Sequence, residues 1–134
     1  MNHKQRIRSA SVPEPADGLW SNCLRVGDQI YISGLTARGS DGLSVEGGDA
    51  YQQSRIIFGK IAALMQAAGG SVDDVVKLTI FVTDISTNQL VWKARREVFS
   101  GDFPASSLVE VSALAKPEIL VEIEAIAHLG CGSR

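Results

Sequence analysis

Two segments near the end of the chain, residues 103–111 and 120–127, constrain the fold most strongly because their side chains alternate. In the second segment, valine, isoleucine and alanine at odd positions oppose Glu122 and Glu124 at even positions. In the first, the same alternation runs through Leu108. A period of two residues is typical of a β-strand, since successive side chains point to opposite faces. Both segments are therefore predicted to be strands with one buried face.

The turn before the first of these strands is a candidate binding site. Pro104 has no amide hydrogen to donate to a neighbouring strand, so it belongs to the turn. Ser106 and Ser107 then lie where a loop passes into a strand. Binding residues are frequent at such places, because loops carry function on a rigid scaffold.

Two helices are predicted from apolar residues that recur at steps of three and four. The first begins after Asp49, which can cap it, and ends at the glycine pair of residues 69–70. Gln53 and Lys60 are expected on its polar side. The second helix is expected over residues 88–100.

Further strands are predicted ahead of the last two. Residues 19–26 and 29–34 flank a Gly-Asp pair and are expected to form a hairpin. Residues 76–82 alternate, and Val76 is expected to be the first buried side chain of that strand. A short strand is also expected near residues 43–45.

The order of these elements predicts an α+β fold with a single mixed sheet and both helices packed on one of its faces. Residues 1–18 are expected to form an N-terminal arm that is ordered only if it lies against the body, and residues 19–134 a single domain. The other face of the sheet must also be covered. The apolar residues expected there, which favour self-association, are Phe81, Leu108, Leu120 and Ile126.

Size and composition limit the class of protein. With 134 residues, 45% of them hydrophobic, the chain suits one globular domain. A formal net charge of -2 argues against broad binding of nucleic acid, which needs a clustered basic surface. No apolar run approaches the roughly 20 residues of a membrane helix, so a cytoplasmic protein without a membrane partner is expected. The cysteines and histidines lack the spacing of metal ligands, and no metal or cofactor is expected.

The final two segments, together with residues 27–34 (Gly-Asp-Gln-Ile-Tyr-Ile-Ser-Gly) and 73–84, resemble the RidA (YjgF) family of small trimeric enamine/imine deaminases. The resemblance covers residues 18–128. It implies a chorismate-mutase-like fold and a homotrimer whose sheets form a central barrel. It also implies clefts between neighbouring subunits that bind a small-molecule ligand.

The resemblance implies a catalytic role for Glu122. The first glutamate of a Glu-x-Glu pair in the last strand positions the water that attacks the imine, and Glu122 holds that place. Glu124 lies on the same side of the strand, and two nearby carboxylates can raise one another's pKa. The alternative is that Glu122 is an ordinary strand glutamate that faces solvent or pairs across subunits.

The resemblance also implies a set of binding residues. Trp20 stands where the family usually has a tyrosine that lines the cleft, although Trp20 could equally pack in the core. Leu108 stands where a cysteine is frequent. The remaining matches, to the Ser-Gly pair and to the serine of a Pro-Ala-Arg-Ser turn, are Ser33, Gly34 and Ser107.

Ser106 departs from the family pattern. It replaces the arginine that grips the substrate carboxylate in the Pro-Ala-Arg-Ser turn. A bidentate arginine contact is worth on the order of 1.5 to 3 kcal/mol and a neutral hydrogen bond about 1. Weak binding of 2-aminoacrylate and 2-iminopropionate is therefore expected unless another cation reaches the cleft. The candidate cations are Arg25, Arg38, Arg55 and Lys116.

Three functions are compatible with the sequence. The first is a RidA-like hydrolase acting on an enamine, an imine or a related small carbon-nitrogen compound. The second is a non-catalytic trimer that binds a small metabolite or has a regulatory role. Ribonuclease activity, a label that the family has carried, is disfavoured by the acidic composition.

Overall fold

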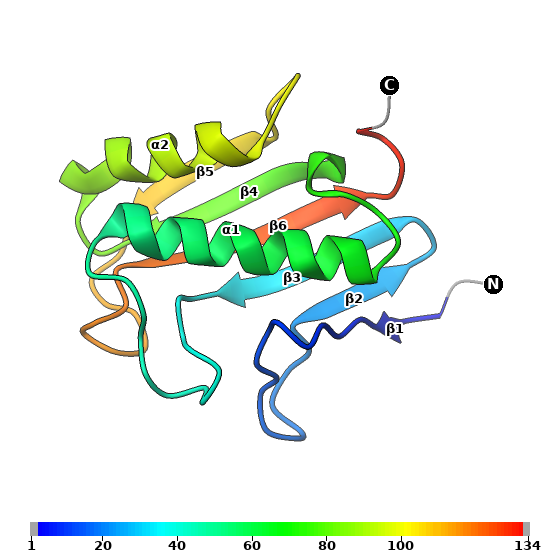
Figure 1. Cartoon of the computed structure of the whole chain (residues 1–134), viewed down its shortest axis with the longest axis horizontal. Helices are drawn as coiled ribbons and strands as arrows, with labels where there is room; N and C mark the ends of the chain where they lie inside the picture. The colour runs from blue at the N-terminus through cyan, green and yellow to red at the C-terminus, as the bar shows by residue number, and fades with distance from the viewer. Residues whose placement is uncertain (1–2, 133–134) are drawn as a thin grey trace.

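A mixed six-stranded sheet carries both helices on one face, as the sequence predicted (Figure 1). The computed structural model describes residues 3–132, so residues 1–2 of the expected arm and 133–134 of the expected domain lie outside the described part. The strand order is β1-β2-β3-β6-β4-β5, and β4 and β5 are the parallel pair. The bounds are β1 Gln5–Arg6, β2 Cys23–Val26, β3 Gln29–Leu35, α1 Ala50–Ala67, β4 Val75–Val82, α2 Asn88–Val98, β5 Ala105–Glu110 and β6 Val121–His128.

Strand β6 lies between β3 and β4 and confirms the alternation read from the sequence. Its odd-numbered residues are buried beneath the helices, whereas Glu122 is half-buried and Glu124 exposed. Figure 1 shows α1 crossing in front of β6 and β3, with α2 beside β5. The core therefore fills the layer between the sheet and the two helices.

The first helix begins and ends where predicted. The Asp49 side chain accepts a hydrogen bond from the Gln52 amide at 2.8 Å, and Gly69 has a φ of +93°, which suits glycine after a helix. The second helix ends at Val98, two residues before the predicted end. A short 3-10 turn, Ile85–Thr87, precedes it.

Gln53 corrects the prediction that it lies on the polar side of α1, because it is only 1% exposed. Its Nε2 donates to the carbonyl oxygens of Gly47 and Glu118 at 3.0 and 2.9 Å. Its Oε1 accepts from the Leu120 amide at 2.9 Å. The amide group thus satisfies three buried or half-buried backbone groups and anchors the start of β6, which a periodicity count cannot foresee.

Val76 was wrongly expected to be buried. A register shift between Val75 and Lys77 in the pairing with β6 leaves Val76 37% exposed, while Val75 takes the buried place. A bulge of this kind turns one side chain to the opposite face. Residues 43–45 form no strand, and Val45 makes only an isolated bridge to Arg38.

The arm lies against the body. Gln5–Arg6 pairs with β2 at the edge of the sheet, and Ile7 and Val12 are buried in the core. Because these apolar side chains leave water, the arm is held by packing as well as by strand pairing.

The sheet face opposite the helices exposes apolar side chains. Ile126 is 39% exposed and lies across from Tyr31, which is 41% exposed. The prediction that Leu108 and Leu120 lie on this face is wrong, because both side chains pack against the core. For Leu108 the reason is its register, which places it beside buried Ile80 on the helix side.

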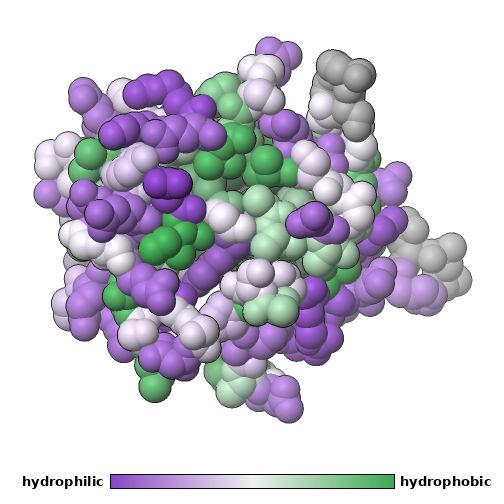
Figure 2. All heavy atoms as spheres, in the orientation of Figure 1, coloured by the Kyte–Doolittle hydropathy of each residue, from purple (hydrophilic) through white to green (hydrophobic). Residues whose placement is uncertain are grey.

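The helix side itself is mixed in character, with hydrophilic side chains gathered over α2 at the upper left of the view (Figure 2). Within residues 3–132, no helix combines the length and the apolar character needed to cross a membrane.

Candidate functional site

Glu122 occupies the face of β6 that points away from the helices. It lies across from Phe81 of β4. Burial raises the pKa of its carboxyl group, and the negative charge of Glu124 raises it further, whereas Arg38 acts in the opposite direction. This pKa direction agrees with the expected influence of Glu124. A carboxyl group poised in this way can both hold and exchange a proton.

Gly34 lies directly against this carboxyl group. A Cβ built on residue 34 would overlap Oε2 of Glu122 and lie 2.9 Å from its Cδ. The register shift of β3 between Ile32 and Leu35 falls at this place. A side chain at residue 34 would therefore displace the carboxylate, which gives a physical reason for the glycine.

Ser33 holds the neighbouring strand. Its Oγ donates to the carbonyl oxygen of Ser21 at 2.5 Å, and its amide donates to the carbonyl of Asn22 at 2.9 Å. Because the hydroxyl hydrogen is used, Ser33 can offer a ligand only its lone pairs.

Trp20 is not a core residue, since it is 54% exposed. Its indole Nε1 donates to Oδ1 of Asn22 at 3.2 Å. Asn22 is buried, and it in turn donates to the carbonyl oxygen of Pro13 at 2.8 Å. The ring is thus oriented at the surface and its face is free to contact a ligand.

Ser106 and Ser107 point to opposite faces of β5. Nη1 of Arg95, from α2, donates to Oγ of Ser106 at 2.8 Å on the helix side. On the other side, Nζ of Lys77 donates to Oγ of Ser107 at 2.9 Å. Leu108, two residues after Ser106, is half-buried on the helix side.

Ser106 and Glu122 do not meet within one chain. Strand β4 separates β5 from β6, which puts the two strands about 10 Å apart at a spacing of about 4.8 Å per strand. Their side chains also leave the sheet on opposite faces. The structure thus divides the predicted residues into one group around Glu122 and Gly34 and another around Ser106 and Leu108.

Among the four predicted cations, Arg38 is the one whose charge acts on Glu122. Nζ of Lys116 donates to the Leu43 carbonyl at 2.8 Å, and Arg55 lies 4.0 Å from Glu97. Arg25 donates to the carbonyl oxygen of Ala68 at 3.2 Å, at the end of α1.

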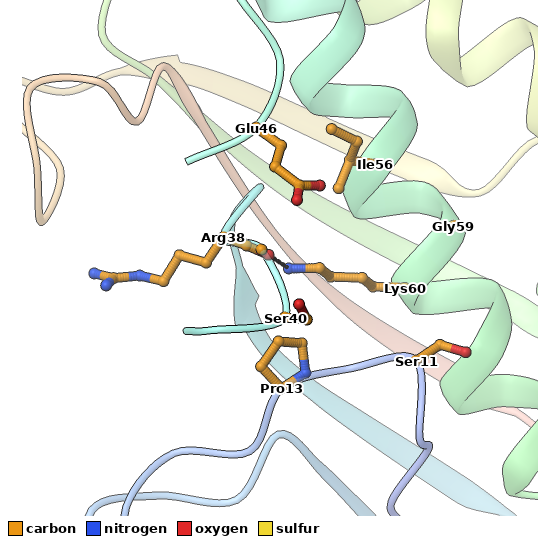
Figure 3. Close-up of a pocket in the computed structure, with 9 residues that line it drawn as sticks. Ser11, Pro13, Arg38, Ser40, Glu46, Ile56, Gly59 and Lys60 are labelled. Carbon is orange, nitrogen blue, oxygen red and sulfur yellow. Dashed lines mark hydrogen bonds between the residues drawn. The ribbon is translucent and has the colours of Figure 1, made fainter. Parts of the chain in front are cut away.

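The backbone of Arg38 is fixed by Lys60, whose Nζ donates to the carbonyl oxygens of Thr36 and Arg38 at 2.7 Å each. Burial lowers the pKa of Lys60. A cavity of about 310 Å³ opens here, and Figure 3 shows the Arg38 side chain extending away from Lys60 and Glu46. The two hydrogen bonds from Lys60 therefore fix the backbone from which the Arg38 side chain extends.

Arg95 was missed among the candidate cations. It follows buried Val91 by four residues and precedes half-buried Val98 by three, so it lies on the inner side of α2. That spacing was available in the sequence. The sequence did not reveal that α2 would lie beside β5.

The buried cysteine, Cys23, is not a second reactive centre. Burial raises the pKa of the Cys23 thiol to about 11, and Glu14 adds to that rise, so its reactive thiolate is scarce. Among the residues that the structure describes, no group of three or more His, Cys, Asp or Glu side chains is placed to hold a metal ion.

Comparisons with known proteins agree over nearly the whole chain. The family model described as Endoribonuclease L-PSP matches residues 11–129. A RutC family protein from Pyrococcus abyssi is 32% identical over 125 residues, covering 93% of this chain and 97% of the relative.

Solved structures share both the fold and the sequence. A protein of unknown function from Pseudomonas aeruginosa is 42% identical with a TM-score of 0.86, covering 97% of this chain and 95% of its own. RidA from the Antarctic bacterium Psychrobacter sp. PAMC 21119 is 34% identical with a TM-score of 0.85, at coverages of 93% and 99%. TdcF from E. coli, solved with bound serine, is 28% identical with a TM-score of 0.82, at coverages of 93% and 98%. On the match of the family model and of these relatives, the chain belongs to the RidA (YjgF) family, also described as Endoribonuclease L-PSP.

Proposed function

We propose that this protein hydrolyses a small imine or enamine in clefts between the subunits of a homotrimer. The observation that carries the proposal is Glu122, a half-buried carboxyl group with a raised pKa, in a space that Gly34 keeps open. Burial of an acid costs stability, and a carboxyl pKa raised by burial and by a neighbouring like charge is typical of a functional position.

The chemistry requires one group that accepts a proton and later returns it. The Glu122 carboxylate takes a proton from water while the water oxygen bonds to the carbon of the C=N group. The nitrogen of the resulting carbinolamine receives that proton. As the C–N bond breaks, the same carboxylate passes the hydroxyl proton to the leaving nitrogen, so the products are a carbonyl compound and ammonia and the carboxylate is restored. A raised pKa helps the return of the proton to nitrogen, because the pKa of the acid then lies closer to the working pH.

The placement of the cleft between subunits is supported by two features. Ser106 and Glu122 lie on opposite faces of one sheet, so a small ligand could contact both only with a second chain. The exposed apolar face around Tyr31 and Ile126 provides a surface on which copies could associate. The exposed ring of Trp20 would then serve as a cleft wall.

The second candidate is a trimer that binds a small metabolite without turnover. The replacement of the family's arginine by Ser106 favours it, because affinity for an amino-acid-like substrate would fall. The bound serine of TdcF makes serine a suitable probe for this alternative.

The test compares Glu122→Gln with Glu118→Gln, an exposed glutamate on the segment before β6. Ammonia release is measured with 2-iminopropionate generated in situ and with imines that lack a carboxylate. We expect Glu122→Gln to lower turnover by about 100-fold, in the range of general acid-base catalysis, and Glu118→Gln to leave it unchanged. Equal rates for Glu122→Gln and the unmutated protein would reject the hydrolase. Serine binding without turnover of any compound would favour the binding trimer.

A further inference from the structure

We infer that Arg95, resting on Ser106 at the outer strand β5, forms an anion-binding site that receives the carboxylate group of a small ligand. The inference rests on the proposed function, and it names a substrate class for the cleft: imines that carry a carboxylate. The required cation would come from α2 instead of from the strand residue that the family uses.

The first support is the contact itself. The guanidinium of Arg95 is half-buried and donates through Nη1 to Oγ of Ser106 at 2.8 Å. A serine hydroxyl is neutral, so it orients the guanidinium without cancelling its charge. Ser106 thereby becomes the support of a cation.

The second support is the missing counter-charge. None of the ion pairs within residues 3–132 involves Arg95. Burial lowers the pKa of Arg95, and the charge of Arg96 lowers it further, which means that its surroundings disfavour the positive charge. A half-buried cation with no carboxylate beside it is costly, and an incoming anion removes that cost.

The third support is geometry. Arginine carries five N–H donors in a planar fork that fits a carboxylate through two parallel hydrogen bonds, and the structure uses one of them at Ser106. Within residues 3–132, β5 is the last strand of the sheet, and no strand pairs with its outer side. Trp92 lies one helical turn before Arg95 and is 37% exposed, so the two residues are neighbours along the surface of α2.

The experiment titrates the full-length protein with pyruvate, which carries a carboxylate, and with pyruvamide, its neutral counterpart. Affinities are measured by calorimetry for the unmutated protein, Arg95→Gln, Arg95→Lys and Ser106→Ala. Arg96→Gln is the matched control, since it removes an equal charge from an exposed neighbouring residue. Subunit mass and melting temperature are recorded for every variant.

We expect Arg95→Gln to weaken pyruvate binding by about 10- to 100-fold, the range of a lost charge-assisted contact, with pyruvamide binding unchanged. Arg95→Lys should fall between, because an ammonium keeps the charge and loses the fork. Ser106→Ala should weaken pyruvate binding by about fivefold, because the guanidinium keeps its charge and loses only the hydroxyl that orients it. Arg96→Gln should stay within about twofold, since an exposed charge is screened.

Three results would overturn the inference. The first is a folded Arg95→Gln variant that binds pyruvate as tightly as the unmutated protein does. Arg95→Gln could dissociate the subunits while Arg96→Gln does not, which would mean that the guanidinium pairs with a carboxylate of a neighbouring copy. The unmutated protein could fail to bind pyruvate yet hydrolyse neutral imines through Glu122, in which case the proposed function stands and this site does not. Pyruvate binding that depends on Arg95, with no turnover of any imine, would support the anion site and reject the hydrolase.

Discussion

The Glu122 carboxylate occupies the space in which residue 34 would carry a Cβ, because Gly34 lets the backbone of β3 approach the side chain on β6. Any side chain at residue 34 must move either the strand or the acid. The close approach thus links a backbone position of β3 to the proposed catalytic carboxyl group.

Gly34→Ala is therefore expected to reduce turnover by about tenfold or more, since small misplacements of a catalytic group are costly. The matched control is Gly59→Ala on α1, where a Cβ would meet no atom within 4 Å. Gly59→Ala should keep full activity and gain about 0.5–1 kcal/mol of stability from its better helix propensity. The measurements are steady-state ammonia release and thermal unfolding. Full activity of Gly34→Ala would contradict the role given to the close approach.

The pH dependence of turnover should report the raised pKa of Glu122. The carboxylate form accepts the proton from water, so the rate should fall as the pH drops through that raised pKa. Glu124→Gln removes a repulsive charge and should move the acidic limb to lower pH, whereas Arg38→Gln should move it to higher pH. The profiles of kcat/KM for the two variants should therefore shift in opposite directions. Shifts in one common direction would contradict the assigned causes.

The same carboxyl group should lower stability at neutral pH. Its pKa is higher in the folded than in the unfolded chain, so its contribution to stability is present below the unfolded pKa and lost as pH rises through the folded pKa. Glu122→Gln should therefore melt at a higher temperature than the unmutated protein at pH 7. The difference should shrink on acidification towards pH 4. An unchanged or lower melting temperature at pH 7 would mean that another contact compensates the buried charge.

Much of the fold followed from periodicity, because burial of one face imposes alternation on a strand and a three-to-four repeat on a helix. The odd residues of β6 and the Asp49 cap were correctly predicted for this reason. Val76 was not, since a bulge is a property of the pairing with β6 and leaves no mark in a single strand. Leu108 was predicted on the wrong face of the sheet, because its face depends on the parallel register of β5 with β4.

Less of the candidate site than of the fold could be predicted from the sequence. The resemblance named Glu122 and Gly34, and the structure places them in contact. The contact between Arg95 and Ser106 joins residues eleven positions apart through the packing of α2 on β5, which no local pattern encodes. Residue type alone therefore indicated four other cations, and Arg95 was not among the predicted ones.

Subunit association should depend on the exposed face of the sheet. Ile126 lies at 39% exposure across from Tyr31, so Ile126→Lys would place a charge in the apolar surface proposed to be buried between copies. We expect a lower subunit mass by light scattering, together with reduced turnover if the clefts lie between subunits. Leu43→Lys, on a loop at 65% exposure, is the control and should leave the mass unchanged. A trimer that survives Ile126→Lys would place the interface elsewhere.

Moving the cation from α2 to β5 tests whether the two positions serve one ligand. Ser106→Arg alone places a second guanidinium beside Arg95, and like charges at this distance repel, so we expect little gain in pyruvate affinity. Arg95→Gln alone should lose about 10- to 100-fold. The double variant Arg95→Gln/Ser106→Arg should recover most of that loss, because one fork again faces the ligand without a competing charge. Calorimetry measures the coupling as a double-mutant cycle. Simple additivity of the two changes would mean that residues 95 and 106 act on separate sites.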